Sequence, residues 1–288
     1  AKELDSPKDW CYVYNFKNPK VPKAIALENG QGKVFKKDID EFIEEIGLEI
    51  PKIFFSKEFE NSKNLIYNTH QQKAQEILNE LNDIAREYKF VFKQTEKGIL
   101  SIPLKNNRPM TDEELNTLSE EEIENLMELS NELSQRAYDY VKMVREVEKD
   151  LTEEIKKLKD KNIYKTLEIH IDSLTEKYKD NKDIIEYLKD MKTDIGTNYD
   201  MFMAEESTQI EGMFFIGNRK ESFMKRYNVN LFLDNSNKNQ APVIREMNPN
   251  YYNLFGKIEY VNELGGLRTD HLKIRPGSLH EANGGYII

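Results

Sequence analysis

The chain has 288 residues and a formal net charge of −10, and 33% of its residues are charged. This length allows one large domain or two modest ones, and the polarity suits long exposed helices better than one compact globule. A net acidic chain is a poor default binder of nucleic acids or membrane surfaces. No apolar run approaches the ~20 residues that a bilayer span needs. Cys11 is the single cysteine, which excludes an internal disulfide and favours a reducing cytoplasm.

The first fifty residues predict two strands and one helix. Residues 10–16 are aromatic and β-branched, as in a buried strand, and residues 23–27 predict a second strand before the turn signal Asn29-Gly30. Residues 38–46 predict an amphipathic helix, because apolar side chains recur at i, i+3, i+4 and i+7. Gly47 is placed to end this helix.

Residues 56–88 and 119–161 predict two long helices that pack antiparallel, and Ser56 is suited to cap the first. At ~1.5 Å per residue the second would reach on the order of 60 Å. Each carries apolar residues at the alternating spacings of four and three that are typical of a coiled-coil seam. The seam residues are Ile77, Leu81, Ile84 and Tyr88 in the first helix, and Leu133, Ala137, Tyr140, Val144, Val147 and Leu151 in the second. Ile155 and Leu158 then shift the seam by one residue.

Shorter elements surround these helices. Residues 90–104 predict a hairpin that turns at Glu96-Lys97-Gly98, and Thr111 and Ser119 each precede acidic residues that favour a helix start. After residue 161 we expect separate shorter helices. One carries Leu167, Ile171 and Leu174; another carries Ile184, Ile185, Leu188 and Met191 and is broken by Gly196; residues 204–217 form a polar link.

The C-terminal region is rich in turn signals, and strands are predicted at residues 229–233, 243–244 and 286–288. Tyr286, Ile287 and Ile288 read as the start of a buried strand, which needs a sheet to pair with, so we expect the chain to be a piece of a longer protein. Neither end has enough strands to close a sheet alone. We therefore expect both ends to share one sheet in an α/β domain that a helical insertion interrupts; two unrelated small domains are the alternative.

The polar residues give no strong catalytic signature. His70, His170, His271 and His280 lie away from the cysteine and form no HExxH motif, so we expect no zinc site, and the helical pair His70 and His170 to be exposed or in a seam. The acidic clusters at 112–114 and 120–122 favour helix starts rather than metal binding. The Tyr251-Tyr252 pair suits core or interface packing better than stacking on a ligand.

Three terminal stretches resemble the segment that leads into the Walker B strand of Lon-related ATP-dependent proteases: residues 252–260 (YNLFGKIEY), 266–270 (GLRTD) and 275–288 (RPGSLHEANGGYII). Residues 9–16 (DWCYVYNF) are similar to the strand after the Walker A helix, in the branch whose AAA+ module carries a large helical insertion. Glu281 stands where relatives often have a basic residue.

This resemblance implies a mixed α/β, mostly α fold: a partial AAA+ core interrupted by a coiled-coil-like insertion with a small β-hairpin. Residues 1–50 would be the first part of the core, residues 51–204 the insertion, and residues 205–288 the second part. Tyr286, Ile287 and Ile288 would begin the Walker B strand. Gly284 and Gly285 would let the backbone pass closely where that strand starts, residues 279–283 would form a helical turn, and Asn283 would bond to the loop backbone.

The resemblance also implies a cytoplasmic ATP-dependent serine protease that uses ATP and Mg, acts on protein substrates and forms a homo-oligomeric ring, which we expect to be a hexamer. The sequence holds no GxxxxGK[ST] loop, and we expect neither Walker B acid nor Ser-Lys dyad in it. We therefore expect no catalytic residue, metal or cofactor, and no activity of this chain alone.

A loop with Leu264, Gly265, Gly266 and Leu267 suits an exposed, apolar substrate grip, and an ordinary surface loop is the alternative. Two other functional classes stay open. A non-enzymatic coiled-coil scaffold or adaptor is favoured by the seams, and a nucleic-acid-remodelling ATPase with a coiled-coil arm is disfavoured by the net charge.

Overall fold

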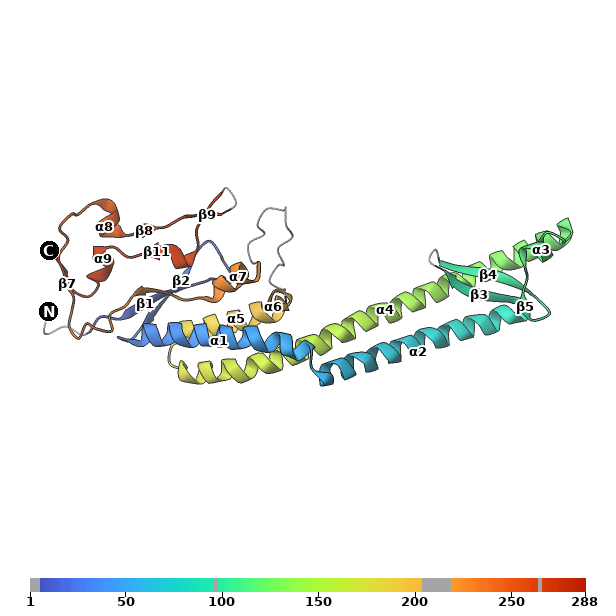
Figure 1. Ribbon diagram of the computed structural model, residues 1–288, viewed down its shortest axis with the longest axis horizontal. Coiled ribbons are helices and arrows are strands. Elements are labelled where there is room, and N and C mark those ends of the chain that lie inside the picture. Colours follow the sequence, from blue (N-terminus) through green and yellow to red (C-terminus); the bar gives the residue numbers. More distant parts are fainter. Residues whose placement is uncertain (1–5, 96–97, 204–218, 264–265) are drawn as a thin grey trace, which may run out of the picture. The chain divides into compact units, whose positions relative to one another are not determined.

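The computed structural model describes residues 6–95, 98–203, 219–263 and 266–288 (Figure 1). The fold is mixed α/β and mostly helical, as predicted. The chain divides into two compact units: unit 1 holds residues 1–55 and 160–288, and unit 2 holds residues 56–159. Among the described helices, none combines the length and apolar content that a bilayer span requires.

The main sheet of unit 1 joins the two ends of the sequence. Its order is β2 (Lys23–Leu27), β1 (Asp9–Val13) and β6 (Asn230–Leu233), with the central strand antiparallel to both neighbours. Cys11 stands opposite Ile25 on one side and Leu231 on the other. The prediction that the ends share one sheet is therefore confirmed.

Helices cover one face of this sheet. Cys11, Val13 and Ile25 are fully buried on that face, because strand side chains alternate between the two faces. The covering helices are α1 (Gln31–Phe54), the later part of α4 (Glu120–Lys177) and α5 (Lys182–Thr197). Their contributions to the common core include Phe35, Ile39, Ile163, Leu167, Leu188 and Met191.

Helix α1 is longer than predicted, because Gly47 does not end it. The helix continues through Gly47 and Pro51 to Phe54. Ile43 and Ile46 before the glycine and Ile50 after it are all buried on the same face. This continuous apolar stripe outweighs the weak helix propensity of one glycine, and the proline falls in the last turn.

Helix α4 is one continuous helix of 58 residues, so the predicted separate helix around Leu167 and Ile171 is wrong. The sequence from residue 120 to residue 177 contains neither glycine nor proline. The shift of the seam at Ile155 and Leu158 changes the buried face without breaking the backbone. In α5, Gly196 lies inside the helix, where an added Cβ would come within 2.6 Å of the Tyr164 ring. It permits close packing, and the helix ends one residue later, at Thr197, close to the predicted break.

The residues predicted as the insertion do not all belong to unit 2. Residues 160–203 pack in unit 1, where Ile163, Leu167, Ile171 and Leu188 join the core beneath the sheet. The compact helical unit therefore covers residues 56–159, a shorter stretch than the predicted 51–204. Periodicity alone marks these segments as helices but does not say which core each one joins.

Unit 2 contains a small sheet and two long helices that run side by side (Figure 1). Helix α2 (Lys57–Glu87) is capped as predicted by the Ser56 side chain, which accepts a hydrogen bond from the Phe59 N–H at 3.2 Å. It is followed by β3 (Phe90–Thr95), β4 (Gly98–Lys105), β5 (Arg108–Pro109) and α3 (Asp112–Leu115). The predicted hairpin is confirmed as β3 and β4, although residues 96–97 of its turn lie outside the described residues. The third strand was not predicted.

Part of the predicted seam forms the core of unit 2, whereas Ile84, Val147 and Leu151 lie outside that core. Leu81 of α2 packs with Leu133, Ala137 and Tyr140 of α4, and Ile77 and Val144 lie at its margin. Ala85, which the predicted seam left out, is fully buried here. Phe90 and Phe92 add the inner face of the small sheet.

The remaining elements of unit 1 are short. They are α6 (Asp200–Met203), α7 (Arg219–Met224), η1 (Lys225–Tyr227), β7 (Val243–Ile244), α8 (Tyr251–Phe255), β8 (Lys257–Ile258), β9 (Val261–Glu263), β10 (Gly266–Arg268), η2 (His271–Lys273), β11 (Ile274–Arg275), α9 (Ser278–Glu281) and β12 (Tyr286–Ile287). β8 pairs with β11 and β9 with β10, both antiparallel, whereas β12 runs parallel to β7. The predicted link at 204–217 lies outside the described residues.

Candidate functional site

The buried carboxylate of Asp9 fixes the junction between β1, the start of α1 and the loop after β6. Its Oδ2 accepts a hydrogen bond from the Gly32 N–H at 2.8 Å, and its Oδ1 accepts one from the Asn235 N–H at 2.7 Å. A Cβ on Gly32 would come within 2.6 Å of Leu231, so the close approach requires glycine. Two backbone donors therefore satisfy a charge that has no exposed surface.

Two asparagines extend this junction. The Asn29 side-chain amide donates to the carbonyl oxygens of Pro7, Asn235 and Lys238 at 2.7 to 3.1 Å. The Asn235 amide donates to the Lys8 carbonyl at 2.7 Å. The start of β1 and the loop after β6 are thus held together by backbone partners, which makes this corner of the sheet rigid.

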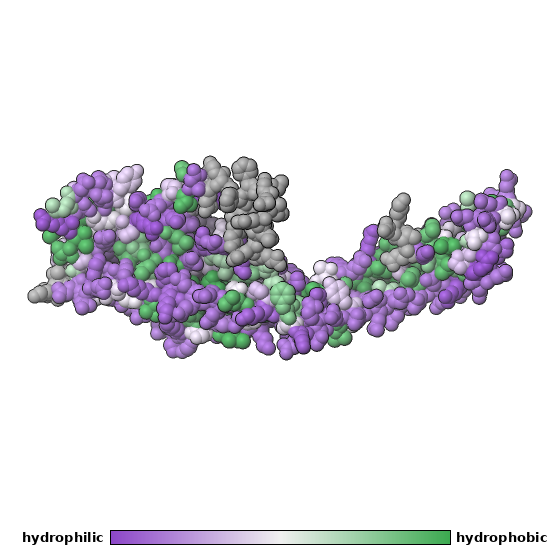
Figure 2. All heavy atoms as spheres, viewed as in Figure 1, coloured by the Kyte–Doolittle hydropathy of each residue, from purple (hydrophilic) through white to green (hydrophobic). Residues whose placement is uncertain are grey.

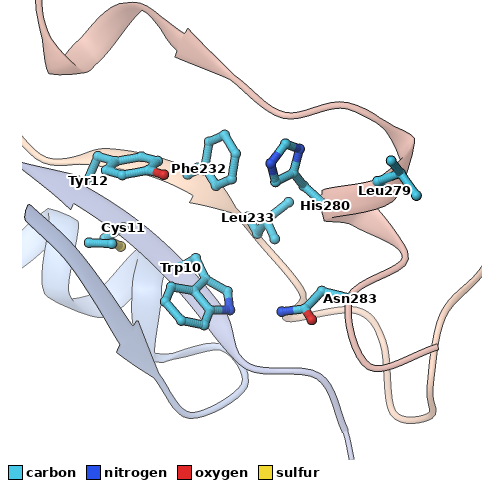
Figure 3. A pocket seen from close by; sticks show the side chains of 9 residues that line it. Trp10, Cys11, Tyr12, Phe232, Leu233, Leu279, His280 and Asn283 are labelled. Atoms are coloured by element: carbon cyan, nitrogen blue, oxygen red, sulfur yellow. The ribbon is translucent and has the colours of Figure 1, made fainter. Parts of the chain in front are cut away.

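A cavity of about 310 Å³ opens beside this corner, on the face of the sheet that the helices do not cover (Figure 3). The sheet contributes the side chains of Trp10, Tyr12 and Phe232, and α9 with the turn after it contributes His280 and Asn283. The remaining lining residues are Cys11, Ala24, Leu233 and Leu279. A concave, largely aromatic site of this kind suits an apolar ligand or a packed segment of protein.

Few polar groups reach this cavity. The Gly277 N–H donates to His280 Nδ1 at 3.2 Å, so the neutral imidazole carries its proton on Nε2. The His280 ring also packs edge-on against Phe232, with ring centroids 5.1 Å apart. Phe232 in turn packs edge-on against Tyr12, with ring centroids 5.0 Å apart. Within the described residues, the Trp10 indole Nε1 is buried without a hydrogen-bond partner. The cavity therefore offers donors to a ligand that carries an acceptor.

The cavity does not contain an activated nucleophile. Burial raises the pKa of the Cys11 thiol to about 12, and the Asp9 carboxylate adds to the rise. The thiol is thus protonated near neutral pH, and a protonated thiol is a poor nucleophile. This arrangement supports binding rather than covalent chemistry.

The other histidines have structural surroundings. His70 is 2% exposed, and its Nδ1 donates to the Ile66 carbonyl at 2.9 Å. His170 lies between Glu45 and Glu49, at 3.1 and 2.9 Å. His271 Nε2 donates to the Asn228 carbonyl at 2.7 Å, and burial lowers the pKa of its imidazole. Nowhere in the described part of the chain do three His, Cys, Asp or Glu side chains gather to hold a metal ion.

The predicted Walker B strand residues form a strand that is not buried. β12 pairs with β7, and the Tyr286 and Ile288 N–H groups donate to the carbonyls of Pro242 and Ile244 at 2.8 Å. Tyr286, Ile287 and Ile288 are 52%, 37% and 74% exposed. The prediction that these residues are buried is therefore wrong for this chain, and their assignment to a Walker B strand stays a prediction.

Of the two glycines before this strand, Gly285 allows the predicted close passage of the backbone, whereas Gly284 has no neighbour within 4 Å and serves the turn through its positive φ. Gly284 has φ +76°, and a Cβ on Gly285 would lie 2.0 Å from the Pro242 carbonyl oxygen. Only glycine permits this approach of two backbones. The helical turn is confirmed as α9, but the Asn283 side chain lies at the cavity and not on the loop backbone (Figure 3).

The predicted substrate-contacting residues are only partly described. Leu264 and Gly265 lie outside the described residues. Gly266 and Leu267 belong to β10, and the Leu267 side chain is 74% exposed. Their role in gripping substrate stays a prediction.

The Tyr251-Tyr252 pair does not pack into the core. The two side chains are 70% and 67% exposed on α8, and Phe255 beside them is 54% exposed. The core interpretation is therefore wrong, and the interface interpretation stays a prediction.

Comparison with protein families places two known segments around this site. A family model described as the Lon-like LonC helical domain matches residues 9–42, and one described as the LonB-like AAA domain matches residues 239–288. The chain is related to the Lon-like proteases. No curated protein matches it at a significant level.

The two matches meet at the candidate site of this Lon-related chain. The first contains Trp10 and Tyr12, and the second contains His280 and Asn283. The LonC helical-domain match covers β1, β2 and the start of α1, which the sequence analysis assigned to the AAA+ core, so that domain assignment stays a prediction. The cavity has no signal in the sequence, because its lining residues come from opposite ends of the chain and share no motif.

Proposed function

We propose that this chain acts within a Lon-like ATP-dependent serine protease, in which an AAA+ region uses ATP and Mg to unfold protein substrates for cleavage. The shared sheet carries this proposal. β1 and β6 pair although the whole of unit 2 lies between them in sequence, and each end of the chain matches a Lon-like family model.

The other parts of the proposal follow from the same relationship. The full-length enzyme would assemble as a homo-oligomeric ring, expected to be a hexamer, in the cytoplasm, and a Ser-Lys dyad would cleave the unfolded substrate. Leu267 supports a substrate grip, because an apolar side chain with 74% exposure is available to contact any polypeptide. This chain would serve as the mechanical part of the enzyme rather than as its proteolytic centre.

The test is degradation by the full-length protein. We expect ATP with Mg to stimulate degradation of a folded protein, and a serine-reactive fluorophosphonate to abolish it. Leu267→Ser should slow this degradation while leaving basal ATP hydrolysis and cleavage of short peptides nearly unchanged. A full-length protein that neither hydrolyses ATP nor cleaves protein would reject the proposal in favour of a scaffold built on the α2 and α4 seam.

A further inference from the structure

An apolar groove lies near one end of unit 2, where α3, the start of α4 and the small sheet meet. Its volume is about 310 Å³. The main apolar residues that line it are Pro103, Leu115, Leu118, Ile123, Leu126 and Met127. Met127 is 63% exposed and Ile123 is 37% exposed, so the groove is open to a partner. We call this surface the tip groove.

The sequence around the tip groove is strongly acidic. Residues 110–135 contain neither lysine nor arginine. Their nine acidic residues are Asp112, Glu113, Glu114, Glu120, Glu121, Glu122, Glu124, Glu128 and Glu132. Figure 2 shows hydrophilic residues over the end of unit 2 that carries α3, with apolar residues among them.

Only three of these nine carboxylates have polar partners within the described chain. Glu114 accepts from the Arg108 guanidinium at 2.7 Å, Glu122 accepts from the Ser119 N–H at 2.8 Å, and Glu132 lies 3.4 Å from the Tyr88 hydroxyl. The other six side chains make no ion pair with any described residue and are exposed to solvent. Arg108 and Lys105 offset part of the charge at Glu114 and Glu122, and the six unpaired carboxylates leave the described region around the groove negative.

Glu120 and Glu124 border the exposed apolar residues that α4 contributes to the groove. On a helix, residues three positions apart are neighbours, so the Glu120 side chain lies beside Ile123 and the Glu124 side chain lies beside Met127. An apolar floor with carboxylates at its rim is complementary to a segment with apolar side chains on one face and Lys or Arg beside them. Charge complementarity steers such a segment to the groove, and burial of apolar surface holds it.

We propose that the tip groove binds a basic amphipathic segment of another protein. Apolar side chains of this segment, spaced at i, i+3 and i+4, fill the groove beside Ile123 and Met127, and its Lys or Arg residues face Glu120 and Glu124. This proposal concerns unit 2 alone and does not depend on ATP hydrolysis or proteolysis by the full-length protein.

Fluorescence anisotropy with the 288-residue chain tests this proposal. The probe is a fluorescein-labelled peptide of about 18 residues, with leucines on one helical face and lysines on the other. Two control peptides keep its length: one has the same composition with the leucines scattered, and the other has glutamate in place of lysine. We expect the basic amphipathic peptide alone to bind, and its affinity to fall as NaCl shortens the Debye length from ~10 Å at 0.1 M to ~3 Å at 1 M.

Matched variants locate the binding surface. Met127→Asp, and separately Glu120→Lys with Glu124→Lys, should each weaken peptide binding at least about tenfold. Glu146→Lys with Asp150→Lys makes the same charge change at the same spacing further along α4, and it should change the affinity less than about twofold. Thermal unfolding followed by circular dichroism confirms that the variants are folded.

Three results would overturn the proposal. The first is equal binding of the scattered peptide, and the second is equal weakening by the Glu146/Asp150 variant. The third comes from sedimentation velocity: a chain that self-associates through Met127 and binds no peptide would assign the groove to a second copy of this chain.

Discussion

The two units differ in how far apart in the sequence their core residues lie. In unit 1 the core brings together β1, α1, the later part of α4, α5 and the residues that flank β6, which span almost the whole chain. In unit 2 every core residue lies between Leu81 and Tyr140, and the helices and hairpin follow one another directly. The difference indicates that unit 2 folds through contacts between elements that are neighbours in the sequence. Unit 1 instead depends on pairing strands from the two ends of the chain.

A single tryptophan makes this comparison measurable. Trp10 lies in β1, so its fluorescence reports unit 1 alone, whereas circular dichroism at 222 nm reports the helices of both units. If the two cores are independent, a substitution in one core should shift only one of two unfolding transitions.

The largest effect is expected from Leu81→Asp in unit 2. Leu81 is 5% exposed, so the variant loses apolar burial and places an unpaired charge in the seam, at a cost of about 5 kcal/mol. Urea unfolding should show an early loss of helical signal while the Trp10 transition stays in place. Leu65→Asp, at a residue that is 68% exposed, is the control and should leave both transitions unchanged. A melting temperature unchanged by Leu81→Asp would reject the seam.

The converse experiment is Phe35→Ala in unit 1. Phe35 is fully buried, and its ring packs edge-on against Tyr178 with centroids 5.4 Å apart. Removing the ring leaves a cavity and should cost about 4 kcal/mol, seen as an earlier Trp10 transition in urea. Phe55→Ala, where the ring is 80% exposed, should change little. Equal shifts of both transitions in Phe35→Ala would show that the cores unfold as one.

A smaller effect is expected at the start of α2. Ser56→Ala removes the side-chain acceptor for the Phe59 N–H and should destabilise unit 2 by about 1 kcal/mol. Ser62→Ala, within the same helix, is the matched control, because its exposed hydroxyl bonds only to the Glu58 carbonyl. Thermal unfolding followed at 222 nm is the measurement, and equal effects of the two substitutions would argue against the cap.

The smallest effect concerns pH. The Arg108 guanidinium, followed by the Thr111 N–H, lowers the pKa of the Glu114 carboxyl from 4.5 to about 2. Because the folded state holds the lower pKa, this contribution is present above pH 4.5 and is lost as the pH falls through 2. When the pH is lowered from 4.5 to 2, the melting temperature of unit 2 should therefore fall less in Glu114→Gln than in the unsubstituted chain. A pH profile identical to that of the unsubstituted chain would show that the pair adds nothing.

The sequence predicts which helices and strands are present better than it predicts the residues at which they begin and end. The 4-3 spacing identifies the seam of unit 2, and the strand patterns at residues 23–27 and 243–244 agree with β2 and β7. Gly47 misleads because the apolar stripe of α1 continues past it, so packing outweighs propensity, whereas α5 does end beside Gly196. The exposure of Tyr286 was also missed, because an apolar run says nothing about whether a second layer covers it.

The candidate site was less accessible to sequence reasoning. Trp10 and His280 meet only because β1, β6 and α9 come together, and no periodic pattern encodes such a meeting. The Asp9 junction has a similar origin, since the carboxylate finds its donors at Gly32 and Asn235. Two sequence signals connected the ends: their resemblance to one protease family, and the shortage of strands that leaves neither end able to close a sheet alone.

The pairing of β1 with β6 also sets an order of events during synthesis. Asp9 and Asn235, which share a hydrogen bond, are 226 residues apart. At roughly 5–20 residues per second, a ribosome needs on the order of 10 to 45 seconds to supply the second after the first. Unit 2 is complete as sequence well before then, so the helical arm can fold while β1 still has an unpaired edge. During that interval the nascent N-terminal strand is the segment most in need of protection by a chaperone.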